Sequence, residues 1–283
     1  MLIKLLRIVI ISHFMSKNVW ANSEFTNAQD HEYGLTATNQ IVQNYPLQTI
    51  PKPQGGKIVT LNKTGYMKTE IDPYSKRFLA EAEKSKGVVL EIGAAFGVVA
   101  KEALARGATV IANDIDNRHL MALAQSTPKQ FLPKLYLNNK IFPWKTSFKE
   151  NSLKAILMSR VAHFLTPEEI ELALTKCHNW LAPGGKLFFV AMSPYHHLLR
   201  EKFLPIYLSK MKAKQQWPGV IDNMHQLNAQ EAKDIPNFLH VFEPVYMTDI
   251  LKRAGFTIEQ IELFDYSNFS SEGKGYLGFV VVK

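Results

Sequence analysis

Residues 88–97 read Val88-Val89-Leu90-Glu91-Ile92-Gly93-Ala94-Ala95-Phe96-Gly97. The first five form a short, mainly β-branched apolar run, which is typical of a strand buried inside a parallel sheet. Gly93 and Gly97 then turn the chain, so that bare backbone with its NH groups can approach a ligand closely. Residues 98–105 follow and end before Gly107, which predicts a helix. Strand, glycine turn and helix together indicate the first part of a βαβ unit.

Strands and helices alternate along the rest of the chain. Further strands are expected at 109–112, 134–137, 155–158, 186–191, 257–264 and 277–282. Further helices are expected at 74–84, after the Asp72-Pro73 cap, and at 118–125, 167–180 and 247–253. This alternation predicts an α/β fold with a doubly wound, mostly parallel seven-stranded sheet.

Residues 1–21 have the three parts of a secretory signal. Lys4 and Arg7 precede an apolar run over residues 8–15, and a small-residue cleavage site ends at Ala21. The run is too short to span a bilayer, so no transmembrane segment is expected. If this signal operates, the protein is exported or secreted. The alternative is an amphipathic or disordered tail on a cytoplasmic protein.

The remaining chain divides into an arm and one large domain. Residues 22–56 are polar and rich in proline, which predicts an extended arm. Residues 57–283 form the predicted α/β domain. Within it, residues 195–245 are about twice as long as a crossover requires, and they predict a helical lid insertion over the ligand site.

The expected ligand site lies beyond the carboxyl ends of the strands, where sheets of this kind bind ligands. Asp114 ends the second strand, 21 residues after Gly93, and its carboxylate could accept hydrogen bonds from both hydroxyls of a ribose. Glu91 would repel a pyrophosphate but suits a ligand with an ammonium group and a sulfonium. The glycine spacing also departs from G-x-G-x-x-G, which disfavours a nicotinamide oxidoreductase.

Several segments together resemble the class I S-adenosylmethionine-dependent methyltransferases. Residues 89–97 resemble the first motif of that family, and Ala112-Asn113-Asp114-Ile115-Asp116 resembles the second. The segments 138–144, 151–156 and 179–187 are similar to later family segments, so the resemblance covers about residues 60–283. It implies a Rossmann-like methyltransferase fold, S-adenosyl-L-methionine as the cofactor, and methyl transfer by in-line attack on the donor methyl.

The resemblance also implies which residues bind the donor. These are Glu91, Gly93, Ala94, Gly97, Asp114, Ile115, Asn138, Asn139 and Ser159. Three positions depart from the family pattern. Ala95 replaces a common glycine, Asn138 replaces an aspartate, and Lys154 replaces an acidic residue.

Catalytic candidates follow the fourth and fifth strands. His163 is the leading candidate for a general base, and the competing interpretation is a hydrogen-bonded structural histidine. Tyr195 and His196 could line the acceptor pocket. Tyr66 and Glu70 could close over the donor. No metal site is expected, because the histidines lack metal-ligand spacing and Cys177 is the only cysteine.

Missing motifs disfavour several classes of methyl acceptor. No clear nucleic-acid motif is present, since an Asn, Asp or Ser before two prolines and an aromatic residue is missing after the fourth strand. Cytosine C5 methylation needs a nucleophilic cysteine, and Cys177 is expected inside a helix. A small molecule is the first expectation. A protein acceptor and a catalytically inactive donor-binding module are the alternatives.

Overall fold

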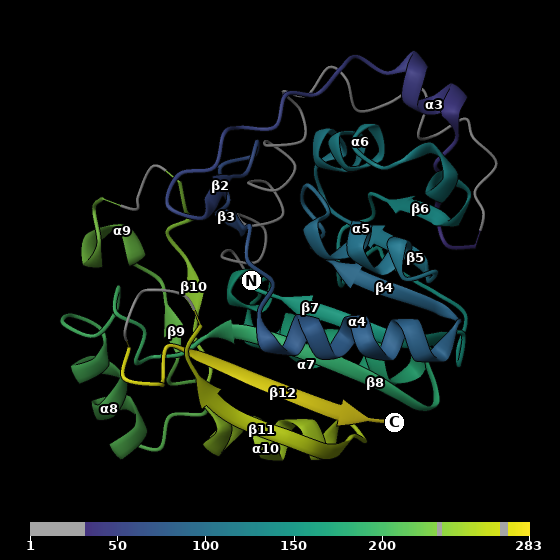
Figure 1. The fold of residues 1–283 in the computed structure, drawn as a ribbon. Helices are drawn as coiled ribbons and strands as arrows, with labels where there is room; N and C mark the ends of the chain where they lie inside the picture. Colours follow the sequence, from purple (N-terminus) through teal and green to yellow (C-terminus); the bar gives the residue numbers. More distant parts are fainter. Residues whose placement is uncertain (1–31, 231–233, 267–270) are drawn as a thin grey trace.

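The computed structural model describes residues 32–230, 234–266 and 271–283 (Figure 1). The expected signal segment, residues 1–21, lies outside the described residues, as does the first part of the expected arm.

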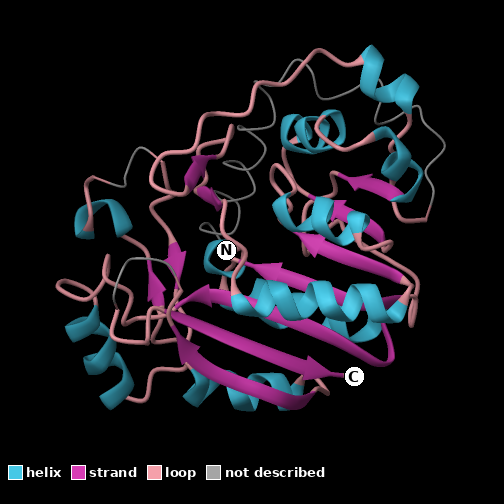
Figure 2. Ribbon diagram, viewed as in Figure 1, coloured by secondary structure: helices cyan, strands magenta, loops and turns pink. Residues whose placement is uncertain are grey.

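A single mixed sheet of eight strands forms the centre of the fold (Figure 2). In spatial order the strands are β1 (Leu35–Thr36), β6 (Leu135–Asn138), β5 (Thr109–Asn113), β4 (Val88–Ile92), β7 (Leu153–Ser159), β8 (Leu181–Met192), β12 (Tyr276–Val282) and β11 (Thr257–Phe264). The strands from β6 to β8 are parallel to one another, and β12 runs antiparallel to both β8 and β11. The expected α/β fold with a mostly parallel sheet is therefore confirmed.

The eighth strand comes from the segment expected to be an extended arm. Strand β1 pairs antiparallel with β6, through Leu35 opposite Leu137. Gly34 precedes it with φ +117°, and a Cβ there would lie 2.5 Å from the carbonyl oxygen of Leu137. Only glycine allows the chain to enter the sheet edge so closely. The same arm contains the short helix α3 (Asn39–Asn44).

Helices cover both faces of the sheet. Helices α4 (Pro73–Ser85), α5 (Val98–Ala105) and α6 (Asn117–Gln125) share one buried apolar cluster with alternate residues of the central strands. Helices α7 (Pro167–Trp180) and α10 (Pro244–Arg253) share a second cluster with the intervening strand residues. Asp72 caps α4 by accepting from the Ser75 backbone NH, and Thr166 and Glu169 form a capping box on α7.

Two smaller units lie beside the sheet. The hairpin of β2 (Lys57–Val59) and β3 (Tyr66–Lys68) was not expected from the sequence. Residues 195–245 contain α8 (Leu204–Lys212), α9 (Met224–Leu227) and the strand pair β9 (Val220–Ile221) and β10 (Leu239–His240). This insertion has a small core of its own, built from Leu199, Phe203, Tyr207, Ile221, Met224, Leu239 and Val241. Among the described residues, no helix combines the length and the apolar character that crossing a membrane requires.

Candidate active site

The glycine loop after β4 is tied to the end of β5 by its own NH groups. Gly93 and Ala94 both donate to the carbonyl of Asn113, at 2.8 and 2.9 Å. The NH of Ala95 donates to Oδ2 of Asp114 at 2.9 Å, and that of Gly97 to the carbonyl of Ala94. Four NH groups of the loop therefore already have protein partners, and the expectation that the loop presents its NH groups to a ligand does not hold for these four. What the loop offers is close approach of its backbone.

The two glycines of the loop are required by their surroundings. Both have φ +72°, in the left-handed region that favours glycine. A Cβ on Gly93 would lie 2.2 Å from Cγ2 of Val161, and one on Gly97 would lie 2.1 Å from Cδ1 of Leu123. The loop is therefore packed tightly between the segment after β7 and helix α6.

Asp114 lies at the carboxyl end of β5 and is nearly saturated by protein donors. Its Oδ1 accepts from the NH of Asp116 at 2.9 Å and from Nδ1 of His119 at 3.0 Å, while Oδ2 accepts from Ala95. A carboxylate has about four acceptor positions, so one remains, on Oδ2. Among the described residues the carboxylate thus keeps one open acceptor position, whereas bonds to both ribose hydroxyls would need two. Beside it, the side chain of Ile115 is 48% exposed, as an apolar surface for a planar ring would be.

The other expected donor-binding residues differ in how far their side chains are already bonded. The amide of Asn138 accepts from Asn113 and from the NH of Lys140, both at 3.1 Å, and donates to the carbonyl of Tyr33 at 3.3 Å. The hydroxyl of Ser159 donates to Oδ2 of Asp72 at 3.2 Å. Asn139 lies half-buried at the same sheet edge. The structure therefore uses Asn138 and Ser159 to join neighbouring segments.

Glu91 is the most unusual ionisable group at this edge. It is 7% exposed, and its Oε2 has no hydrogen-bond partner among the described residues. Burial raises the pKa of this carboxyl to about 8, and neighbouring Arg160 only partly opposes the shift. The acid is therefore protonated at neutral pH in the ligand-free protein, and a cation that enters the site would favour its ionised form.

Replacing Glu91 by glutamine is expected to change how stability depends on pH. In the ligand-free protein the folded state keeps the Glu91 proton up to a pKa of about 8, whereas an unfolded chain loses it near 4.5. Raising the pH between these values therefore disfavours folding, by at most about 1.4 kcal/mol per pH unit. Urea unfolding at pH 5, 6, 7 and 8 should show wild type losing stability relative to E91Q as the pH rises. A constant difference would contradict the buried, protonated carboxyl.

Next to Glu91, a second group of buried polar residues includes two that sequence reasoning missed, Arg160 and Asp72. Arg160 follows β7 with φ +60°, an uncommon conformation for a side chain of its size. Its guanidinium donates to Oδ2 of Asp72 at 3.2 Å and to the hydroxyl of Tyr266. Asp72, read from the sequence only as a helix cap, is fully buried. The long side chain of Arg160 reaches a residue 88 positions earlier, which no local pattern reports.

The three expected catalytic residues occupy different environments. His163, in a 3₁₀ turn over Ala162–Phe164, is 9% exposed and its Nδ1 has no partner among the described residues. Burial, reinforced by the charge of Arg160, lowers the pKa of His163 to about 3, so the ring is neutral. His196 is 4% exposed and lies 3.3 Å from the Tyr276 hydroxyl through Nε2. Tyr195 instead donates to Glu243 at 2.8 Å. The hydroxyl of Tyr207, in α8, also donates to Glu243, so this residue connects the insertion to the start of α10.

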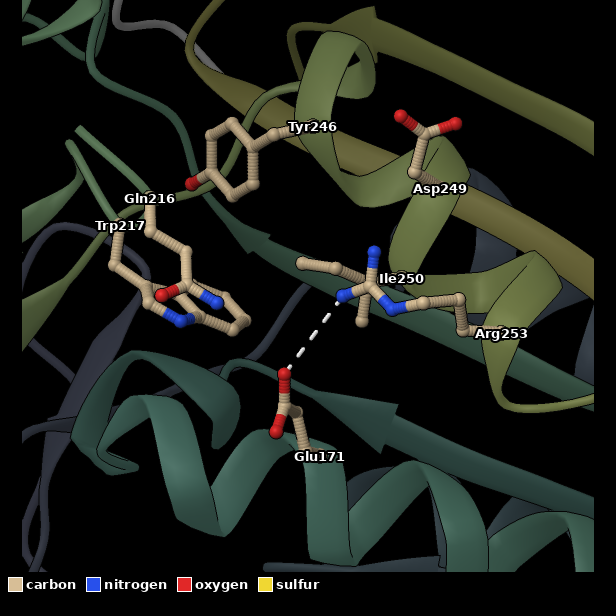
Figure 3. Close-up of a pocket in the computed structure, with 7 residues that line it drawn as sticks. All are labelled: Glu171, Gln216, Trp217, Tyr246, Asp249, Ile250 and Arg253. Carbon is tan, nitrogen blue, oxygen red and sulfur yellow. Dashed lines mark ion pairs between the residues drawn. The ribbon is translucent and has the colours of Figure 1, made fainter. Parts of the chain in front are cut away.

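A pocket of about 320 Å³ lies elsewhere, between α7, α10 and the segment at Gln216 and Trp217 (Figure 3). Tyr246, Asp249 and Ile250 also line it, and Glu171 and Arg253 pair across it at 3.7 Å. None of the expected donor-binding or catalytic residues lines this pocket. Across the described ranges, no three His, Cys, Asp or Glu side chains are grouped as metal ligands.

Comparisons with known proteins agree with this fold. Residues 90–189 match the family model described as "Methyltransferase domain". No curated protein matches the chain in sequence. Among solved structures, an S-adenosylmethionine-dependent methyltransferase from Mesorhizobium loti is similar with a TM-score of 0.56 and 17% identity, covering 75% of this chain and 96% of that one.

Two further structures are similar to the same extent. One from Methanosarcina mazei, described as an S-adenosylmethionine-dependent methyltransferase, has a TM-score of 0.54 and 18% identity, over 76% of this chain and 98% of that one. The 1,6-didemethyltoxoflavin-N1-methyltransferase of Burkholderia thailandensis, solved with its acceptor and S-adenosylhomocysteine, has a TM-score of 0.50 and 15% identity, over 75% and 78%. Residues 90–189 therefore match a methyltransferase domain, and about three quarters of the chain has the fold of S-adenosylmethionine-dependent methyltransferases.

Proposed function

We propose that this methyltransferase transfers the methyl group of S-adenosylmethionine to a small molecule at the carboxyl edge of β4, β5 and β7. The observation that carries the proposal is the buried Oε2 of Glu91, which has no partner among the described residues, close to the loop that Asp114 binds. The donor is a cation with an ammonium group, and binding it would give Glu91 its missing partner.

The other donor-binding roles follow from position. Gly93, Ala94 and Gly97 would let the donor approach the backbone, Oδ2 of Asp114 would accept one ribose hydroxyl, and Ile115 would cover the adenine. Asn139 is the remaining polar candidate near the adenine, since Asn138 already bonds three protein groups. Ser159 would act indirectly, by holding the Asp72 carboxylate through its hydroxyl. The Burkholderia thailandensis enzyme, which has a similar fold, was solved with 1,6-didemethyltoxoflavin bound.

Methyl transfer would proceed by attack of the acceptor on the donor methyl, with loss of the positive charge on sulfur. Positioning of the two reactants would be the main contribution of the protein. His163 has a neutral ring and an Nδ1 without a partner within the described part of the chain, so it could take the proton of the acceptor, although burial and the charge of Arg160 make it a weak base in the ligand-free protein. The buried site would carry one positive charge before and after the step, first on sulfur and then on the imidazolium. His196 and Tyr276 would line the acceptor side, and residues 195–245 would cover it.

The proposal can be tested in two stages. Calorimetric titration of the protein with S-adenosylmethionine and S-adenosylhomocysteine should show one site of micromolar affinity, and no binding of either would overturn the donor site. Incubation with methyl-labelled donor and a cell extract, separated by size, should then label the small-molecule fraction. Label in the protein fraction would favour a protein acceptor. Donor binding without label in either fraction would favour an inactive donor-binding module.

Replacing His163 by glutamine should separate proton transfer from donor binding. Removing a general base lowers turnover by about 10²–10⁴-fold. We expect such a loss at saturating donor, with the affinity for S-adenosylhomocysteine unchanged. His178→Gln, on α7, is the matched control, because its ring packs against Phe256 away from this site. Unchanged turnover in H163Q would leave His163 with a structural role only.

A further inference from the structure

We infer that His119 is a positioning residue that holds Asp114 in place for the donor and links it to the β2–β3 hairpin. His119 lies in the first turn of α6, within the segment 118–125 that was expected to be a helix. Its side chain is 1% exposed, so water cannot replace its contacts. The inference rests on the proposed role of Asp114 in donor binding.

Both ring nitrogens of His119 have defined partners. The NH of Leu61 donates to Nε2 at 2.9 Å, so Nε2 carries no proton. The hydrogen is therefore on Nδ1, which lies 3.0 Å from Oδ1 of Asp114 and donates to it. A backbone NH 58 residues away thus selects the tautomer that the carboxylate requires.

The ring of His119 also packs against the glycine loop. Phe96 contacts it edge to face, with 4.9 Å between ring centroids. Phe96 is 1% exposed and shares a small buried cluster with Ile58 of β2 and Ala122 of α6. The hairpin, the loop and the helix therefore meet around this one imidazole.

This arrangement determines which oxygen of Asp114 faces the donor. Oδ1 is filled by His119 and by the NH of Asp116, whereas Oδ2 accepts only from Ala95 within the described part of the chain. Three donors hold the carboxylate, two on Oδ1 and one on Oδ2. The His119 bond is the one of the three that a side chain supplies, and its loss would leave Oδ1 held by a single NH, loosen the carboxylate and weaken the ribose contact.

Two substitutions can separate the bond between His119 and Asp114 from the bond between Leu61 and His119. The amide nitrogen of asparagine approximates Nδ1, so H119N can still donate to Asp114 but cannot reach Leu61. The longer glutamine places its amide near Nε2, so H119Q can accept from Leu61 but leaves Asp114 without this donor. Met121→Ala, at a buried position of the same helix, controls for loss of packing in α6.

Calorimetry with S-adenosylhomocysteine and hydrogen exchange of the Leu61 amide give independent measurements. We expect H119Q to weaken binding about tenfold, as loss of a hydrogen bond to a charged group does, and H119N and M121A to stay within about threefold of wild type. Protection of the Leu61 amide should be lost in H119N and kept in H119Q. In wild type, S-adenosylhomocysteine should increase that protection, since coupling between two sites is reciprocal.

The outcomes distinguish this inference from the proposed function. If wild type binds S-adenosylhomocysteine and H119Q binds equally well, or if H119N and H119Q weaken binding equally, the positioning role is overturned. If wild type does not bind, the donor site itself fails. The nitrogen chemical shifts of His119 then still test the link, and a hydrogen on Nε2 would overturn it.

Discussion

Replacing Asp114 by alanine is expected to weaken S-adenosylhomocysteine binding by about a hundredfold. The change removes the one open carboxylate position for a ribose hydroxyl, a bond to a charged acceptor that contributes about 1.5–3 kcal/mol. It also leaves the NH of Ala95 and Nδ1 of His119 without their acceptor, so the glycine loop loses one of its hydrogen bonds to the end of β5. Isothermal titration calorimetry measures the loss directly.

Asp116→Ala provides the control for this prediction. Asp116 lies two residues further on, caps α6 through the NH of Arg118, and binds the Arg118 guanidinium. Removing its side chain should reduce stability by about 1 kcal/mol, as loss of an N-cap does. The backbone NH that Asp116 donates to Asp114 stays in place, so affinity should be unchanged. Equal affinities of the D114A and wild-type proteins would remove Asp114 from the site.

Replacing Gly97 by alanine should destabilise the protein by about 2–5 kcal/mol. A left-handed backbone conformation costs an L-residue about 1–2 kcal/mol, and the added methyl group would overlap Leu123 in a packed core, which costs about 1–3 kcal/mol more. Urea unfolding of the ligand-free protein measures the sum.

Gly107→Ala isolates the backbone part of that effect. Gly107 also has a positive φ, of +92°, but nothing lies within 4 Å of the position that its Cβ would occupy. Its substitution should therefore show only the conformational cost, of about 1–2 kcal/mol. If both substitutions cost the same, packing against Leu123 does not explain the glycine at position 97.

The central elements could be predicted because their sequences carry local patterns. Strand β4 (88–92) and helix α5 (98–105) have the predicted bounds, since glycines or charged residues interrupt the apolar runs there. Strand β1 and the β2–β3 hairpin were missed, because strands of two or three residues show no periodicity. Their places depend on contacts with distant residues, such as the pairing of Leu35 with Leu137.

For the site, likewise, the sequence predicted where residues lie but not which hydrogen bonds they make. The alternation of strands and helices indicated that Gly93, Asp114, Asn138 and Ser159 would lie at the carboxyl edge of the sheet. The sequence could not show which polar atoms the protein already uses. Asn138 is bonded to three protein groups, and His119 carries a contact to Leu61 that only the folded hairpin provides.

Strand β1 affects how readily copies of this protein can associate through the edge of the sheet. Without it, β6 would present an open row of NH and CO groups, the template on which a strand from a second molecule can assemble. Leu35 and Thr36 pair with this row, and the NH of Ala37 donates to Leu135. The strand that takes over the edge has only two residues, too few to recruit another chain. By pairing with β6, the arm therefore opposes aggregation through this edge of the sheet.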